Sequence, residues 1–272
     1  MCTKIEDMSK VAILFKDWQD TLIWSCIQKV MGEIYVDQLE APKSAMAQVC
    51  DFSFLTGEVN KALISYKPEG YKNDFIIMVP QNEIWAKAIE EVYGKRAKRV
   101  VRYAIKKEKY IFDKKKLQSI VEHLPEGYEI KPIDEILYNK ALEADWSRSF
   151  VENYTNYEAY AKLGFGFVIL KGEEMVSGVS AYSRYIEGVE IEIDTREEYR
   201  RQGLAFVCAA QMILECLERN LYPSWDAQNK WSVALAEKLG YHYDYDYVAY
   251  EIYPYEEVSH RNSKDEHKCK EK

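Results

Sequence analysis

The sequence predicts an α+β protein: a mixed sheet flanked by helices in the carboxy-terminal half, preceded by a smaller mixed α/β domain. Three strand-like segments follow one another over residues 166–195, and a long apolar helical segment begins at about residue 204. Helical and strand-like segments also alternate through the first 125 residues. With 47% apolar residues in a chain of 272, both regions can bury a hydrophobic core.

The amino-terminal region, residues 1–125, is interpreted from hydrophobic spacing and helix-end signals. Asn82 and Asp113 carry side chains that cap helices, and Gly94 marks the end of the first of these helices. No motif in this region indicates a function. In chain order we expect a helix at 15–31, a strand at 75–79, a helix at 83–93, a strand at 100–105 and a helix at 114–124.

Turn-forming residues predict a domain boundary after residue 125. Pro125 and Gly127 follow the last helical segment of the first region, and a strand-like run begins at once at 128. We therefore expect a first domain at 1–125 and a second at 126–255. The remaining residues, 256–272, form a polar tail that we expect to be disordered.

Helix caps and turn-forming glycines also mark the ends of several elements in the second region. Asp134 can cap a helix that continues to about residue 150, and Gly172 permits a tight hairpin turn. Gly240 is a helix end. In chain order we expect a strand at 128–133, helices at 135–150 and up to 162, strands at 166–170, 175–183 and 188–195, a helix at 204–219, a strand at 221–225, a helix ending at 239, and a last strand to 253.

Composition argues against metal-binding, secreted and membrane proteins. The six cysteines include no pair at the two-residue spacing of a zinc knuckle, and only four histidines are present, so no metal is expected. The first seven residues carry acids where a secretory signal carries a basic patch. No apolar run approaches the roughly 18 residues of a membrane helix. We expect a cytoplasmic protein with no membrane partner.

A basic run lies between residues 95 and 116, and one interpretation is a nucleic-acid patch. Glu108 and Asp113 interrupt this run, and the formal net charge of the chain is −8. Solvated faces of a strand and a helix are therefore the favoured interpretation, and no nucleic-acid partner is expected.

The strand predicted at 188–195 places three acids on one face. Glu190, Glu192 and Asp194 alternate with apolar residues, so their side chains point to the same side. This face can be a solvated outer surface. It can also line an active-site cleft, where crowding by like charges would raise the pKa of one carboxylate toward that of a general base.

After this strand the chain turns directly into an apolar helix. The turn is formed by Arg200, Arg201, Gln202, Gly203, Leu204 and Ala205. Backbone N–H groups at a helix start are unpaired and carry partial positive charge. Gly203 lets the backbone approach a ligand closely, and the two arginines add charge, so the loop suits a pyrophosphate. Its spacing differs from that of the P-loop and of the dinucleotide fingerprint.

Here the sequence resembles the GNAT superfamily of N-acetyltransferases. Their coenzyme loop reads Arg/Gln-x-x-Gly-x-Gly/Ala, which Arg200, Gly203 and Ala205 match, and residues 229–241 resemble the family's Asn-x-x-Ala…Gly-Phe stretch. This resemblance covers about residues 126–253 and implies a GNAT-type, mostly antiparallel sheet. The sequence at 192–195, 203–205 and 222–226, and at 35–37 and 42–44 in the first domain, is similar to that of zwittermicin A resistance acetyltransferases.

The resemblance implies acetyl-CoA as the co-substrate. In the family, the fourth and fifth strands splay apart, and pantetheine pairs with backbone that corresponds here to Ile193, Asp194 and Thr195. Asn229 would contact the pantetheine arm, with Ser232 beside it.

The resemblance also implies a reaction. An amine of a small molecule, deprotonated by Glu192 or Glu190, would attack the thioester carbonyl, and a backbone N–H would stabilise the developing oxyanion. A homodimer is a possible assembly of this chain. Asp226 could orient the substrate or cap the helix that follows, and the cap is favoured.

One departure from the family pattern concerns the general acid. The family often places a tyrosine in its last helix to protonate the leaving thiolate, and this position is Ala236 here. The tyrosines at 241, 243, 245 and 247 are more typical of packing in a strand. The general acid is therefore unassigned. A coenzyme-binding regulatory or partner-binding module that has lost catalysis stays the alternative to an enzyme.

Overall fold

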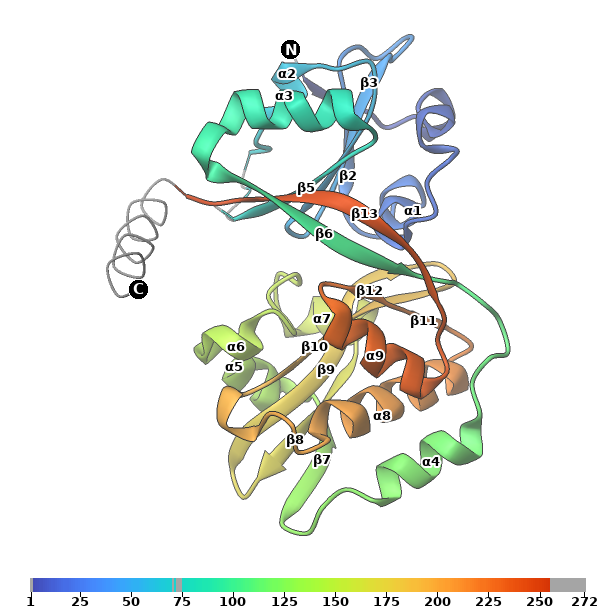
Figure 1. Cartoon of the computed structure of the whole chain (residues 1–272), viewed down its shortest axis with the longest axis vertical. Helices are drawn as coiled ribbons and strands as arrows, with labels where there is room; N and C mark the ends of the chain where they lie inside the picture. The colour runs from blue at the N-terminus through green and yellow to red at the C-terminus, as the bar shows by residue number, and fades with distance from the viewer. Residues whose placement is uncertain (1, 70, 72–74, 255–272) are drawn as a thin grey trace, which may run out of the picture. The chain divides into compact units, whose positions relative to one another are not determined.

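The computed structural model describes residues 2–69, 71 and 75–254 (Figure 1). Contacts between Cα atoms divide the chain into two compact units, Met1–Arg102 with Tyr247–Lys272, and Tyr103–Asp246. The tail predicted at 256–272 lies outside the described residues. No helix among these described residues has the length and apolar character that crossing a membrane requires.

The first unit contains a mixed sheet. Its strands in spatial order are β1 (Thr3–Lys4), β2 (Glu33–Val36), β3 (Ser44–Val49), β4 (Phe52–Gly57), β5 (Ile76–Pro80), β13 (Tyr243–Ile252) and β6 (Ala97–Ile105). Strands β4 and β5 are parallel, whereas β13 is antiparallel to β5. The strand predicted at 75–79 is thus confirmed, and it pairs with β13, the last strand of the described residues.

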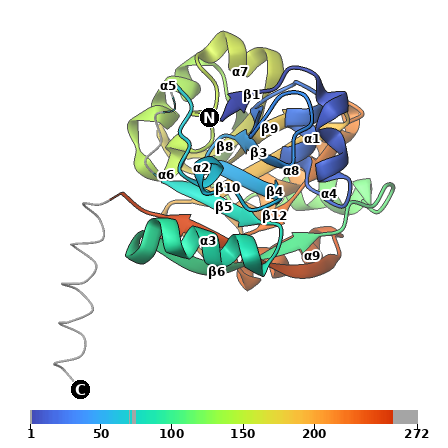
Figure 2. The same cartoon turned by 90° about the horizontal axis from the view of Figure 1, so that it is seen from above.

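Helices cover both faces of this sheet (Figures 1 and 2). Helix α1 (Thr21–Ile27) packs on β2 and β3, while α2 (Lys61–Ile64) and α3 (Glu83–Tyr93) share a core with Met46, Leu55 and Met78 on the other face. The helix predicted at 15–31 is shorter than expected, because Asp20 caps α1 only at residue 21. Short 3-10 turns occupy Met8–Lys10, Ala12–Phe15 and Gly94–Arg96.

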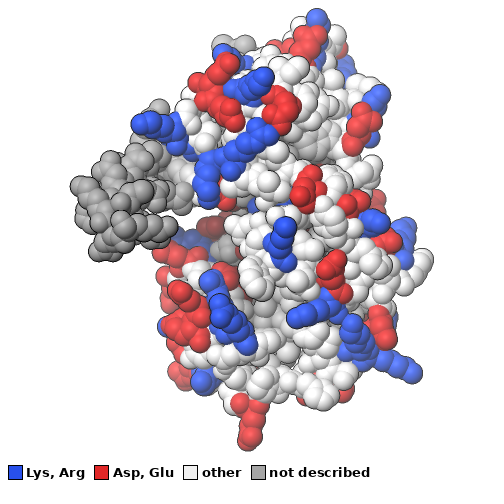
Figure 3. All heavy atoms as spheres, viewed as in Figure 1, with Lys and Arg blue, Asp and Glu red and all other residues white. Residues whose placement is uncertain are grey.

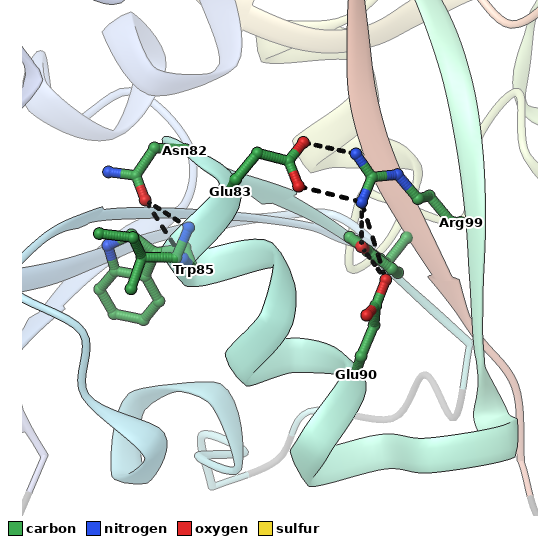
Figure 4. A network of polar contacts seen from close by, with 7 residues as sticks. Asn82, Glu83, Trp85, Glu90 and Arg99 are labelled. Atoms are coloured by element: carbon green, nitrogen blue, oxygen red, sulfur yellow. Dashed lines mark hydrogen bonds and ion pairs between the residues drawn. The ribbon is translucent and has the colours of Figure 1, made fainter.

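The predicted start and end of α3 are confirmed. The Asn82 side chain accepts hydrogen bonds from the backbone N–H groups of Ile84 and Trp85, and Gly94 ends the helix with a φ of 54° (Figure 4). Trp85 is fully buried and donates from Nε1 to the carbonyl oxygen of Gly57 at 3.0 Å. A cap and a buried anchor therefore fix α3 on the sheet.

Two basic residues of the 95–116 run, Lys98 and Arg99, have acidic partners within this unit. Arg99 on β6 forms a bidentate ion pair with Glu83 of α3 and also donates to the hydroxyl of Tyr250 at 3.1 Å (Figure 4). Lys98 pairs with Glu251 at 2.9 Å. Figure 3 shows the two charge signs side by side on the visible face. These pairs agree with solvated faces, and the expected absence of a nucleic-acid partner stays a prediction.

The second unit contains a five-stranded sheet in which only one pair of strands is parallel. Its spatial order is β11 (Tyr222–Ser224), β10 (Gly188–Thr195), β9 (Glu174–Tyr185), β8 (Gly166–Lys171) and β7 (Tyr128–Pro132). The pairs β7–β8, β8–β9 and β9–β10 are antiparallel, and β10–β11 is parallel. The predicted mixed, mostly antiparallel sheet is confirmed, as is the hairpin turn at Gly172, which has a φ of 61°.

Helices also cover both faces of the second sheet. Helices α4 (Lys114–Glu122), α8 (Leu204–Glu218) and α9 (Lys230–Leu239) share one core with the apolar side of β10. On the other face lie α5 (Glu135–Glu143), α6 (Asp145–Arg148) and α7 (Tyr157–Leu163). The helix predicted at 135–150 is two helices, because Ala144 between them has an extended backbone (φ −118°, ψ 137°). The Ser147 hydroxyl donates a hydrogen bond to the carbonyl oxygen of Ala141.

The division between the compact units does not coincide with the boundary predicted at 125. Ile105 of β6 and Leu117 of α4 are 2% and 1% exposed and lie in the core of the second unit. Gly127, with a φ of 86°, forms a turn between α4 and β7 inside this unit. Turn residues mark a chain reversal as readily as a domain linker, which explains the displaced boundary.

Candidate functional site

Strands β10 and β11 separate after three residue pairs. The last pair joins Glu190 to Ser224, and the chain beyond β11 forms β12 (Asp226–Ala227), which pairs with the end of β6 instead. Opposite Glu190 and Ile191 the neighbouring strand β9 contains a bulge, which increases local twist. Residues 191–195 of β10 therefore present an edge that pairs with no other described strand.

Backbone direction decides which residues of β10 face this split. The N–H of Tyr222 donates to the carbonyl of Glu187, and the N–H of Arg196 donates to Val176 on β9. Since the direction alternates along a strand, Ile193 and Thr195 face the split, whereas the backbone of Asp194 faces β9. Of the three predicted pantetheine positions, two have the required direction.

The end of β10 is closed by local contacts. The Thr195 N–H donates to Asp194 Oδ1 at 2.7 Å, and Arg200 Nε donates to the Thr195 carbonyl at 2.9 Å. Arg200 also pairs with Asp194 at 3.3 Å. Ile193 is therefore the residue whose backbone N–H and carbonyl are available at the edge.

The three acids of β10 occupy different environments. Glu190 is 6% exposed, and its negative charge adds to the effect of burial in raising the pKa of Tyr222 to about 12. Glu192 is half-buried, and Ser149 at the end of α6 donates to its Oε1 at 3.4 Å. The Asp194 carboxylate contacts the Thr195 N–H and the Arg200 guanidinium at the end of β10. Glu192 is thus the carboxylate at the open part of the split.

The N-terminus of α8 has no side-chain cap. Helices α1, α3, α4, α5, α7 and α9 are all capped by an aspartate or asparagine side chain. At α8 the capping position is Gly203, with a φ of 82°, and Arg201 before it is also left-handed, with a φ of 63°. A Cβ on Gly203 would meet no atom within 4 Å. Exposed N–H groups of this kind can bind an anion.

The other predicted loop residues contribute in different ways. The Leu204 side chain is buried in the core at 1% exposure, so this residue can offer only its backbone N–H. Ala205 is half-buried, and Gln202 is exposed and accepts a hydrogen bond from the Tyr128 hydroxyl at 2.8 Å. Arg200 is committed to the end of β10, as described above. Arg201 is exposed at the helix start.

Asn229 and Ser232 stabilise the start of α9. Asn229 Oδ1 accepts from the N–H of Ser232 at 3.0 Å, and the Ser232 hydroxyl accepts from Trp225 Nε1 at 2.9 Å. The interpretation of Asp226 as the cap of this helix is wrong, because Asn229 is the cap and Asp226 belongs to β12. Asn229 has the extended backbone of a capping residue, with φ −155° and ψ 171°.

Ala236, at the family's tyrosine position, is fully buried in the core of the second unit. A tyrosine side chain would not fit there without displacing its neighbours. Two contacts of the site were not predicted from the sequence: Ser149 with Glu192, and Tyr128 with Gln202. Each joins residues far apart in the chain, so no local pattern indicates them. Among the described residues no group of three His, Cys, Asp or Glu side chains could hold a metal ion.

Comparison with known proteins assigns this arrangement to a family. The GNAT acetyltransferase family model matches residues 12–250. The chain is 28% identical over 254 residues to the uncharacterized N-acetyltransferase YdfB of Bacillus subtilis (strain 168), covering 89% of this chain and 94% of that protein.

Solved structures agree with this assignment. The crystal structure of a GCN5-related N-acetyltransferase-like protein from Streptococcus suis 89/1591 has a TM-score of 0.85 and 49% identity, covering 90% of this chain and 98% of that one. A putative GNAT-family acetyltransferase from Novosphingobium aromaticivorans shares the fold, with a TM-score of 0.53 and 15% identity over 85% of this chain and 96% of that one. The chain belongs to the GNAT acetyltransferase family and is an N-acetyltransferase.

Proposed function

We propose that this enzyme transfers an acetyl group from acetyl-CoA to an amine of a small molecule, by direct attack of the amine on the thioester. The observation that carries the proposal is the uncapped N-terminus of α8, which adjoins the end of β10 through the loop at 196–203. The family generally uses acetyl-CoA, and this helix start suits the coenzyme's pyrophosphate.

The residues around the split fit the coenzyme. Its pyrophosphate would accept hydrogen bonds from the backbone N–H groups of Gly203, Leu204 and Ala205, with Arg201 and Gln202 beside them. The pantetheine arm would pair with the exposed edge of β10 at Ile193, which agrees with the backbone direction given above. When bound, acetyl-CoA supplies an acyl group activated as a thioester.

The chain's own residues would handle the acceptor. The Glu192 carboxylate would take a proton from the incoming ammonium group, directly or through water, and Ser149 would hold that carboxylate in place. Glu190, buried at the closed end of the split, is the second candidate base. The Ile193 N–H would stabilise the oxyanion that develops on the carbonyl oxygen. The group that protonates the leaving thiolate is not assigned.

The acceptor class follows from resemblance and charge. The similarity to zwittermicin A resistance acetyltransferases supports a small-molecule amine, and the acids of β10 would favour a cationic acceptor. The proposal keeps the cytoplasmic location and the homodimer predicted from the sequence. Sedimentation of the full chain tests the homodimer directly.

The test of the proposed function combines calorimetry and turnover. Acetyl-CoA should bind and raise the melting temperature of the full chain. Release of free CoA thiol should then depend on an amine from a broad panel that includes polyamines and amino sugars. Absence of heat at about 1 mM acetyl-CoA would reject the proposal, since that limit corresponds to only about 4 kcal/mol of binding free energy. Acetylation of a protein amine in preference to every small amine would reject the acceptor class.

A further inference from the structure

Helix α4 packs on α8 within the second unit (Figure 1). A cavity of about 280 Å³ lies between α4 and the start of α8. No pattern in the sequence indicates this cavity, and the proposed reaction makes no use of it. Its walls come mostly from the end of α4 and the start of α8, with the residues that adjoin them: Ser119, Ile120, His123, Gln202, Phe206 and Val207. This volume is close to the lower end of the range for small-molecule sites, about 300–1,000 Å³, so it suits one fused ring system rather than a whole coenzyme.

The lining of the cavity suits a flat heteroaromatic ring. Ile120 and Val207 offer apolar contacts and Phe206 offers an aromatic ring, and such surfaces bind planar bases by stacking. His123 donates from Nδ1 to the carbonyl of Ser119 at 2.6 Å, which fixes this tautomer and leaves Nε2 as an acceptor for an amino group. The Ser119 hydroxyl adds a second polar group.

The position of the cavity links it to the anion site of α8. Gln202 and Gly203 line the cavity and also form the uncapped start of the helix. The Tyr128 hydroxyl holds the Gln202 side chain at 2.8 Å from the strand that follows α4. A ring joined by a short sugar linker to a pyrophosphate at Gly203 would therefore reach the cavity on the side away from the split of β10.

We propose that this cavity binds the adenine ring of the coenzyme, with α4 as one wall of the site. The inference rests on the proposed function, because it requires acetyl-CoA at the start of α8. It gives residues 114–123 a role in coenzyme binding, although they precede the loop at 200–205 by about 80 positions. Adenine supplies the planar ring and the exocyclic amine that the lining calls for.

The test fills the cavity and compares two ligands. Ser119→Phe places an aromatic ring in the cavity from an exposed helical position. Gln118→Phe is the matched control, because Gln118 is exposed on the same helix and does not line the cavity. Each variant is titrated with acetyl-CoA and with S-acetyl-4′-phosphopantetheine, which lacks the adenosine part. His123→Ala is a second variant, at an exposed position, which removes the imidazole ring and its hydrogen bond to the Ser119 carbonyl.

The expected result is a loss that depends on adenosine. Ser119→Phe should weaken acetyl-CoA binding roughly 10-fold and change the affinity for the truncated ligand by less than about twofold, while Gln118→Phe changes neither. His123→Ala should weaken acetyl-CoA binding about threefold with the same selectivity. Equal losses for both ligands, or no loss for either, would overturn the adenine site. Failure of the unmodified protein to bind either ligand would instead overturn the proposed function itself.

Discussion

Arg200 donates from Nε to the carbonyl oxygen of Thr195 at 2.9 Å and thereby closes the end of β10. The adjacent Arg201 has a left-handed φ of 63° and is exposed beside the uncapped start of α8. The two arginines of the loop were predicted to act together on the pyrophosphate. These contacts show that Arg200 holds the strand end, whereas Arg201 is exposed at the helix start. A role of either arginine in binding the pyrophosphate stays a prediction.

We expect Arg201→Gln and Arg200→Gln to have different effects. Arg201→Gln should weaken acetyl-CoA binding roughly 10-fold, which corresponds to about 1.4 kcal/mol, because one charge-assisted contact is lost. Its melting temperature should be unchanged. Arg200→Gln should lower the melting temperature as well, because the Thr195 carbonyl loses its donor. Calorimetry and thermal melts of both variants measure this. Unchanged affinity in Arg201→Gln would remove that residue from the site.

Gly203→Ala tests the anion site against a control with the same backbone. Gly203 and Gly172 have φ values of 82° and 61°, and a Cβ at either position would meet no atom within 4 Å. An alanine at either position should therefore lower the free energy of unfolding by a similar amount, about 1–2 kcal/mol. Only Gly203→Ala should weaken acetyl-CoA binding, because its methyl group lies where the pyrophosphate approaches. Equal affinity in the two variants would contradict the predicted site.

Glu192→Gln should lower turnover more than Glu190→Gln. Glu192 is half-buried at the open part of the split, whereas Glu190 is 6% exposed at its closed end. The loss in kcat for Glu192→Gln should be roughly 10²-fold, with little change in acetyl-CoA affinity. Glu187→Gln, in the exposed turn before β10, is the control. A larger loss in Glu190→Gln would assign the base to that residue instead.

Alkaline pH should destabilise the fold through buried thiols. Complete burial raises the pKa of Cys208 from 9.0 to about 12, so the folded state keeps a proton that the unfolded state releases. The contribution is fully present below about pH 9 and is lost as the pH rises toward 12, at about 1.4 kcal/mol per pH unit for each such group. Cys216, with a pKa also raised by burial, acts with the same sign.

Urea unfolding of the unmodified chain and of Cys208→Ala measures this slope. Between about pH 9 and about pH 11 the free energy of unfolding should fall less steeply in Cys208→Ala, because one releasing group is gone. The cavity left by the substitution lowers stability equally at every pH, so it does not change the slope. Parallel curves for the two proteins would contradict the assignment to Cys208.

Local signals in the sequence determined several of the helix ends. Asn82 with Gly94 correctly delimits α3, Asp113 starts α4, and Gly240 ends α9 with a φ of 108°. These predictions succeed because a capping side chain bonds to N–H groups only two or three residues away. Sequence alone also located the uncapped loop before α8, because the loop lacks such a side chain and contains glycine and arginine instead.

Pairing between distant segments was decided only by the tertiary structure. The sequence could not show that β11 separates from β10 after Ser224, that Ser149 contacts Glu192, or that Leu117 of α4 packs with the core of the second unit. Each of these contacts depends on which faces come together once the chain has folded, and hydrophobic periodicity is the same for any apolar partner. Local signals therefore determined many of the elements and the loop before α8, but they did not indicate strands β2, β3 and β4. Long-range packing decided the domain division, the split of the sheet and the cavity beside α4.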